Sequence, residues 1–98
     1  MSNYEGKYVI VRGDRSGVFA GIFKEKDGQE ITLTDCRRLW YWAGSASISQ
    51  LAVDGTIAPD KCKFTVSVDE IMIMDAIEII PCADKAEQSI RGVKEWRQ

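Results

Sequence analysis

The sequence has 98 residues, of which 45% are hydrophobic and 29% charged, and it carries a formal net charge of −2 without any histidine. These values predict one soluble domain, residues 1–98, whose core is small enough to gain from association into a homo-oligomer. The acidic balance argues against a protein that coats nucleic acid through bulk charge, because such domains carry a clear basic excess; it still allows a local basic patch.

Curled β-structure is predicted for the first third of the chain. Three runs rich in β-branched, aromatic or alternating residues predict strands: Lys7–Arg12, Val18–Lys26 and Gln29–Asp35. The turn-forming segment GDRSG joins the first two, and Asp27-Gly28, the strongest short hairpin signal, joins the second and third. Gly21, in the middle of the second strand, indicates a bulge or sharp bend, which favours a barrel over a flat sheet.

The period of the pattern changes in the middle of the chain. From Cys36 to Trp42 a period of two continues, and it would place two sets of side chains on opposite sides of a strand: Arg37, Leu39 and Tyr41 on one, Arg38, Trp40 and Trp42 on the other. Ser47 and Gln50 then form a capping-box pattern, and apolar residues recur at helical spacing before Gly55. We expect one short inserted helix here.

Further strands and a last helix are predicted for the remaining segments. A loop around Pro59 precedes the alternating run Lys63–Val68, and Glu70–Pro81 supplies one or two strands interrupted near Asp75. Asp84 with Glu87 caps a C-terminal helix that has an apolar stripe. The predicted fold class is α+β, a small curled antiparallel sheet of the SH3-like or Sm-like barrel kind, with one inserted short helix and a C-terminal helix.

Catalytic chemistry has few candidates in this chain. Without histidine there is no ordinary general base near neutral pH, no Ser-His or Cys-His nucleophile and no imidazole ligand for a metal. Asp69, Glu70 and Asp75 lie close in sequence, but their place among strand and turn residues favours a solvated edge over acid–base work. GDRSG lacks the lysine and the following helix of a phosphate-binding loop. We therefore expect a protein that is not an enzyme, with no catalytic residues, no metal and no cofactor; a phosphodiesterase would have to recruit a metal through carboxylates alone.

The cysteines and the chain start indicate the compartment. Cys36, Cys62 and Cys82 are odd in number and widely spaced, which fits neither a disulfide framework nor a C-x-x-C zinc site and favours small buried thiols in a reducing compartment. No apolar run approaches the about 18 residues that a membrane span requires, and MSNYEGKYVIVRG lacks the order of a signal peptide. We expect a cytoplasmic protein with no membrane partner.

The segment Asp35–Thr56 carries the candidate site. It places two arginines, two tryptophans and a tyrosine within six residues, followed by closely spaced serines and a glutamine. Such a surface suits a planar anionic ligand, because rings stack on a base, guanidinium groups bind phosphate, and the start of a helix favours an anion. The candidate ligand-binding residues are Arg12, Arg15, Arg37, Arg38, Trp40, Trp42, Ser45, Ser47, Ser49 and Gln50.

A structural interpretation of the same segment has equal weight. In it, Leu39, Trp40 and Trp42 belong to the core or to a subunit interface, the arginines pair with Asp14 or Asp35, and the serines only cap a helix. Between the two interpretations, packing is the expected role of the aromatic residues, and ligand contact that of the arginines and serines.

Four stretches carry a resemblance to a known family. SGVFAGIF, CRRLWYWAGSASISQLAVDGT, KCKF and IEIIPC, in this order and at these separations, resemble a family of small proteins encoded by tailed bacteriophages and prophages and grouped as a domain of unknown function. The resemblance covers nearly the whole chain. It implies a viral origin, and hence the cytoplasm of a host cell, but it implies no particular activity.

Two classes of function follow from these patterns. In the first, the protein is a non-catalytic, homo-oligomeric binding protein that takes a small anionic, nucleotide-like ligand, and a phage would use it to sequester a nucleotide-type host immune signal. In the second, it is an Sm-like or SH3-like interaction module that binds nucleic acid or a host protein through the same surface. The acidic chain favours a compact pocket, because a nucleic-acid binder needs basic residues along a track.

Overall fold

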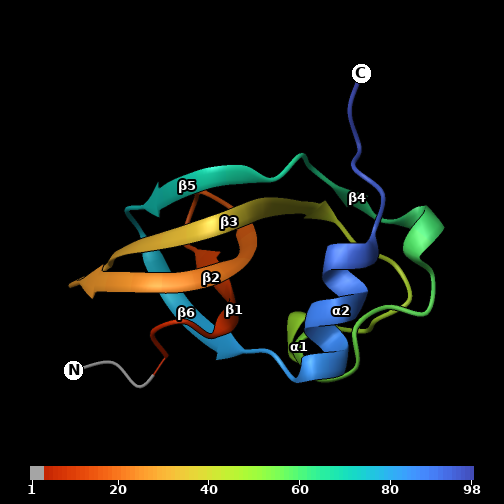
Figure 1. Cartoon of the computed structure of the whole chain (residues 1–98), viewed down its shortest axis with the longest axis horizontal. Helices are drawn as coiled ribbons and strands as arrows, with labels where there is room; N and C mark the ends of the chain where they lie inside the picture. Colours follow the sequence, from red (N-terminus) through yellow and green to blue (C-terminus); the bar gives the residue numbers. More distant parts are fainter. Residues whose placement is uncertain (1–3) are drawn as a thin grey trace.

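Six strands and two α-helices make up the described part of the chain, residues 4–98 of the computed structural model (Figure 1). The strands are β1 (Tyr8–Gly13), β2 (Val18–Asp27), β3 (Glu30–Tyr41), β4 (Lys63–Phe64), β5 (Val68–Ile73) and β6 (Ala76–Pro81). The helices are α1 (Ile48–Asp54) and α2 (Asp84–Gly92), and a short 3₁₀ turn covers Pro59–Lys61. The predicted curled antiparallel sheet with one inserted and one C-terminal helix is therefore confirmed.

The sheet curls because β3 has two successive neighbours along one edge. The strands follow the order β4-β3-β2-β1-β6, and β5 also pairs with β3. The first part of β3 pairs with β5, between Ile31 and Cys36, whereas Leu39 near its end pairs with Phe64 of β4. Asp35 lies within the part that pairs with β5, between Thr34 and Cys36, and its φ of 47°, in the left-handed region, interrupts the regular backbone of the long strand. Within residues 4–98, β5 pairs only with β3 and β6 only with β1, so the sheet is curled but not closed.

A bulge lies at Gly21, as its place in β2 predicts, but its extra residue belongs to β3, where Asp35 and Cys36 both lie opposite Gly21. The pairing of β2 with β3 shifts register between Ala20 and Ile22. A Cβ atom at Gly21 would lie 2.9 Å from the Cβ of Cys36 and 3.0 Å from the carbonyl oxygen of Thr34. Only glycine therefore lets the two strands approach this closely at the bend.

Two apolar clusters fill the two faces of the sheet, because successive residues of a strand point to opposite sides. One cluster, which we call the helix-side cluster, joins the sheet to the helices and contains Tyr8 and Ile10 of β1, together with Ala20, Leu39, Leu51, Ala52, Cys62, Phe64, Ile90 and Val93. The other lies inside the curl and contains Val9 and Val11 of β1, together with Phe19, Phe23, Ile31, Leu33, Cys36, Ile73 and Ala76. Figure 1 shows α1 and α2 beside each other at one end of the sheet.

Two boundaries differ from the sequence-based expectation. The predicted strand Lys63–Val68 is wrong in extent: β4 ends at Phe64, and Val68 already begins β5. Asp84 is not the cap of the last helix, because the N-cap position belongs to Ala83, which makes no side-chain capping hydrogen bond. The interruption expected near Asp75 is confirmed, since it separates β5 from β6. Neither helix within residues 4–98 is long and apolar enough to cross a bilayer.

Candidate functional site

Arg37 and Arg38, the arginine pair of the central segment, point to opposite sides of β3. Arg37 is only 4% exposed, and its guanidinium group donates to four backbone carbonyl groups. The distances from its nitrogen atoms are 3.0 Å to Thr65 O, 2.9 Å to both Ile90 O and Val93 O, and 3.1 Å to Phe64 O. Arg37 therefore holds the end of α2 against the β4 region. The carbonyl groups of the fold occupy four of its five N–H donors, so its burial and partners favour a structural role over the ligand contact expected from the sequence.

Arg38 faces the opposite side and borders a hollow of about 450 Å³. We call this the methionine hollow; it is lined by Arg15, Ser16, Phe19, Arg38, Ile71, Met72, Ile73, Met74 and Asp75. The guanidinium carbon of Arg38 lies 4.6 Å from the centre of the Phe19 ring, and its Nη1 donates to Ser16 O at 2.6 Å. The hollow therefore combines an apolar floor with two exposed arginines, Arg15 and Arg38.

Asp75 fixes the loop beside the methionine hollow. Its carboxylate accepts hydrogen bonds from the hydroxyl group of Ser16 at 2.5 Å and from the backbone N–H groups of Arg15 at 2.7 Å and Ser16 at 3.1 Å. These bonds, that from the Ser16 hydroxyl first, hold the pKa of Asp75 below its ordinary value. The carboxylate thus ties the β1–β2 loop to the β5–β6 turn.

A second hollow gathers four of the predicted ligand-binding residues. This serine hollow has a volume of about 410 Å³ and is lined by Arg12, Val18, Trp42, Ser47, Ile48, Ser49 and Glu78. Arg12 is exposed and forms no ion pair within residues 4–98, although Glu78 lies opposite it on β6. Trp42 is half-buried against the helix-side cluster, so its ring has a fixed position. One arginine, one tryptophan and two serines therefore border one space.

The remaining polar residues of the segment shape the start of α1. Ser47 Oγ accepts from the backbone N–H of Gln50 at 3.1 Å, as an N-cap does, and Gln50 Oε1 accepts from Ala46 N at 2.8 Å. Ser45 Oγ donates to Ser47 O at 3.4 Å. The capping-box prediction is confirmed for Ser47. Ser45 and Gln50 lie outside the lining of the serine hollow and serve the turn that precedes the helix.

Trp40 occupies a third place, separate from both hollows. It is 58% exposed, and its ring stacks on that of Trp96, which is 41% exposed, with ring centres 5.0 Å apart. Lys63 Nζ lies 5.4 Å from the Trp40 ring centre and 5.5 Å from that of Trp96. Of the two places expected for Trp40, the core or a subunit interface, its exposure contradicts the core, whereas Leu39 is buried as expected. Sequence spacing did not indicate Lys63 or Trp96, because their place depends on the pairing of a two-residue strand.

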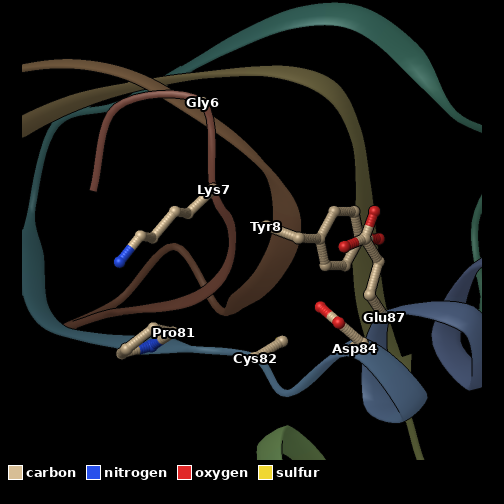
Figure 2. Close-up of a pocket in the computed structure, with 7 residues that line it drawn as sticks. All are labelled: Gly6, Lys7, Tyr8, Pro81, Cys82, Asp84 and Glu87. Atoms are coloured by element: carbon tan, nitrogen blue, oxygen red, sulfur yellow. The ribbon is translucent and has the colours of Figure 1, made fainter.

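Opposite charges line a hollow at the start of α2 (Figure 2). It has a volume of about 420 Å³, and Figure 2 shows Lys7 on one side with Asp84 and Glu87 on the other. Burial raises the pKa of Cys82, near its floor, to about 12, so this thiol is a weak nucleophile. The mixed charge gives this hollow no clear preference for an anion.

Asp35 pairs with Arg91 rather than with Arg37 or Arg38, and Arg91 also binds Glu87 at 2.8 Å. All three cysteines are free, and burial raises the pKa of Cys36 to about 12. No group of three or more carboxylate or thiol side chains within residues 4–98 is placed to hold a metal ion.

Comparison with solved structures defines the class of the fold. A heptameric archaeal Sm protein, whose crystal structure was discussed for its implications for the eukaryotic snRNP core, superposes with a TM-score of 0.52. The alignment has 17% sequence identity and covers 83% of this chain and 93% of that one. The molecule is thus an Sm-like domain in its fold, which agrees with the predicted barrel class.

Sequence comparison places the chain in a family. Residues 6–90 match the domain of unknown function DUF6948, and the chain belongs to that family. None of the curated proteins matches it. The expected membership of a domain of unknown function is confirmed over nearly the whole chain.

Proposed function

We propose that this protein is a non-catalytic, self-assembling Sm-like module that binds a nucleotide-type anion in the serine hollow. The observation that carries the proposal is the convergence of Arg12, Trp42, Ser47 and Ser49, from β1, the end of β3 and the start of α1, on one space of about 410 Å³. Concave sites of this size, with an aromatic wall and a few converging polar groups, are typical of small-ligand sites.

Each group of the serine hollow has a role toward a nucleotide. The Arg12 guanidinium binds a phosphate oxygen, and the half-buried Trp42 ring packs against the base. The Ser49 hydroxyl donates to the phosphate, while the Glu78 carboxylate accepts from a ribose hydroxyl or a base amino group. A single arginine beside one carboxylate suits a compact ligand of low charge better than a long polyanion.

Self-assembly is supported by strand edges of β5 and β6 that have no partner strand within residues 4–98. Strand β5 offers one free edge and β6 another, and exposed apolar side chains accompany both: Val68 and Met72 on β5 and Ile77 on β6. Because unpaired strand edges readily pair with another chain, the β5 edge of one subunit fits the β6 edge of the next. Such a head-to-tail contact closes into a ring or continues as a filament. The heptameric state of the archaeal neighbour supports the ring.

A sequestering role is the finer part of this proposal. The resemblance of the sequence to phage and prophage proteins supports action in the cytoplasm of an infected host. There, a protein that binds a nucleotide-type immune signal without converting it would lower the free concentration of that signal. We expect the bound nucleotide to be recovered intact after long incubation with magnesium or manganese; turnover would show that the protein is an enzyme.

Native mass spectrometry, before and after incubation with a panel of cyclic and linear nucleotides, tests assembly and binding together. We expect an assembly of at least two subunits and the added mass of an intact nucleotide. A monomer at micromolar concentration would reject the assembly, and the absence of any nucleotide adduct would reject the ligand class.

Calorimetric titration of two matched variants tests the site itself. Arg12→Ala should weaken nucleotide binding by about 1.5–3 kcal/mol, the range for hydrogen bonds to a charged group. Arg15→Ala removes the same side chain at the methionine hollow and should leave binding unchanged. Equal losses in both variants would mean that overall charge, and not the serine hollow, is responsible.

A further inference from the structure

Two exposed tryptophans form a surface that the proposed function does not use. Trp40 and Trp96 lie in neither apolar cluster; their rings stack on each other at 5.0 Å with an interplanar angle of 30°. The Lys63 ammonium lies 5.4 Å and 5.5 Å from the two ring centres. We name these three residues the indole platform. Large rings left this exposed at one place are a common feature of binding surfaces.

Backbone pairing holds the indole platform in place. The register between β3 and β4 shifts between Leu39 and Tyr41, so Trp40 lies at an irregularity of the pairing. The chain after α2 then returns alongside β4: Trp96 N donates to Phe64 O at 2.8 Å, and Phe64 forms a parallel bridge with Glu95. Figure 1 shows this C-terminal segment passing beside β4. The two rings are therefore fixed by main-chain contacts from three segments before any partner arrives.

The two segments that carry Lys63 and Trp96 have a charge opposite in sign to that of the whole chain. The segments that carry Lys63 and Trp96, residues 60–63 and 94–97, contain four basic and two acidic residues, whereas the chain has a net charge of −2. One of the two acids, Glu95, is held by Arg97 at 2.6 Å. Lys63 itself forms no ion pair within residues 4–98. A surplus of positive charge thus coincides with exposed rings.

We propose that the indole platform is a docking surface for a single-stranded nucleic acid. An unpaired base stacks on the outer face of an indole ring, and the neighbouring phosphate meets the Lys63 ammonium. A duplex fits poorly, because its bases are already stacked and paired. The proposal goes beyond the serine hollow, which takes a small nucleotide, and it does not depend on that site.

Fluorescence anisotropy of labelled 12-residue oligonucleotides tests the indole platform. The probes are oligo(dT), oligo(rU) and a duplex of equal length, each titrated with the whole protein at low and moderate salt. We expect both single strands to bind and the duplex to bind at least several-fold more weakly. Trp96→Ala should reduce the affinity for single strands about tenfold, within the range for loss of one base–aromatic stack. Preference for one of the two single strands would identify DNA or RNA as the partner.

Matched variants separate the platform from general effects. Trp96→Phe keeps a ring and should retain most of the binding, while Lys63→Gln should weaken binding and its salt dependence; Lys85→Gln, at a lysine paired with Asp54, should change neither. Arg12→Ala should leave oligonucleotide binding intact, so this test fails or succeeds independently of the serine hollow. Far-ultraviolet circular dichroism confirms that each variant is folded.

Four outcomes would overturn the proposal: equal binding of duplex and single strand, no effect of Trp96→Ala in a folded protein, equal losses in Lys63→Gln and Lys85→Gln, or binding of a proline-rich peptide in place of either oligonucleotide.

Discussion

Arg37 and Trp40 lie three residues apart on β3 and exchange the environments that their residue types usually occupy. The arginine is 4% exposed and the tryptophan 58%. Arginine is seldom buried without partners, yet here backbone carbonyl groups from β4, the following residue and the end of α2 receive its donors. The path of β3 and the docking of α2, rather than residue type, therefore decide which side chains of the central segment face solvent.

Removal of the buried guanidinium group of Arg37 should have the largest effect on stability. Arg37→Ala removes a donor from the carbonyl groups of Phe64, Thr65, Ile90 and Val93. Phe64 O keeps the N–H of Trp96 and Ile90 O that of Val93, so the main loss falls on Thr65 O and Val93 O, at about 1–3 kcal/mol for each unsatisfied group. We expect the free energy of unfolding to fall by about 4 kcal/mol in a urea titration. Arg38→Ala, the adjacent exposed arginine, should cost less than about 1 kcal/mol. Similar losses in both variants would contradict the structural role of Arg37.

Leu39 and Trp40 are adjacent apolar residues that should differ in their contribution to stability. Leu39 is 2% exposed and belongs to the helix-side cluster, so Leu39→Ala should destabilise the protein by about 3 kcal/mol through lost burial and a cavity. Trp40→Ala removes a much larger side chain but should cost less than about 1 kcal/mol, because the ring is mostly in solvent. Thermal melts of the two variants check the order. A Trp40→Ala melt as low as that of Leu39→Ala would show that the indole platform is part of the core.

Local patterns predicted the strands, and long-range pairing decided the site. The hairpin of β2 and β3 was predicted correctly from three local signals: the alternation of Gln29–Asp35, the Asp27-Gly28 turn and the bend or bulge expected at Gly21. These signals act between near neighbours in the sequence. The return of Trp96 to β4 could not be read from spacing, since β4 has two residues and its partner lies more than thirty residues later.

The residue types of the central segment predicted a candidate site, and the fold places those residues at separate locations. Alternation along β3 correctly placed Arg37 and Arg38 on opposite sides, but only the position of α2 shows that the side of Arg37 is covered. Arg12 and Trp42 come together because β1 and the end of β3 flank the same space as the start of α1. That convergence joins segments thirty residues apart and leaves no periodic signal in the sequence.

Asp75 is a half-buried charge that binds backbone groups, and we expect its removal to have the smallest effect. Asp75, like Arg37, holds main-chain atoms, but hydrogen bonds lower the pKa of its carboxyl group below the ordinary value of 3.8. A group whose pKa is lower in the folded than in the unfolded state contributes stability above the unfolded value and loses it as pH falls through the folded one. We expect the wild-type protein to lose a small part of its stability below about pH 4 for this reason.

Asp75→Asn keeps the size of the side chain and removes the ionisation, so its stability should be lower at pH 7 and the difference from wild type should shrink toward pH 2. Urea titrations of both proteins at pH 7, 5, 3 and 2 measure this difference, and Asp69→Asn, at an exposed carboxyl group of β5, serves as the control. A difference between wild type and Asp75→Asn that stays constant with pH would show that the loop depends on the shape of the side chain and not on its charge.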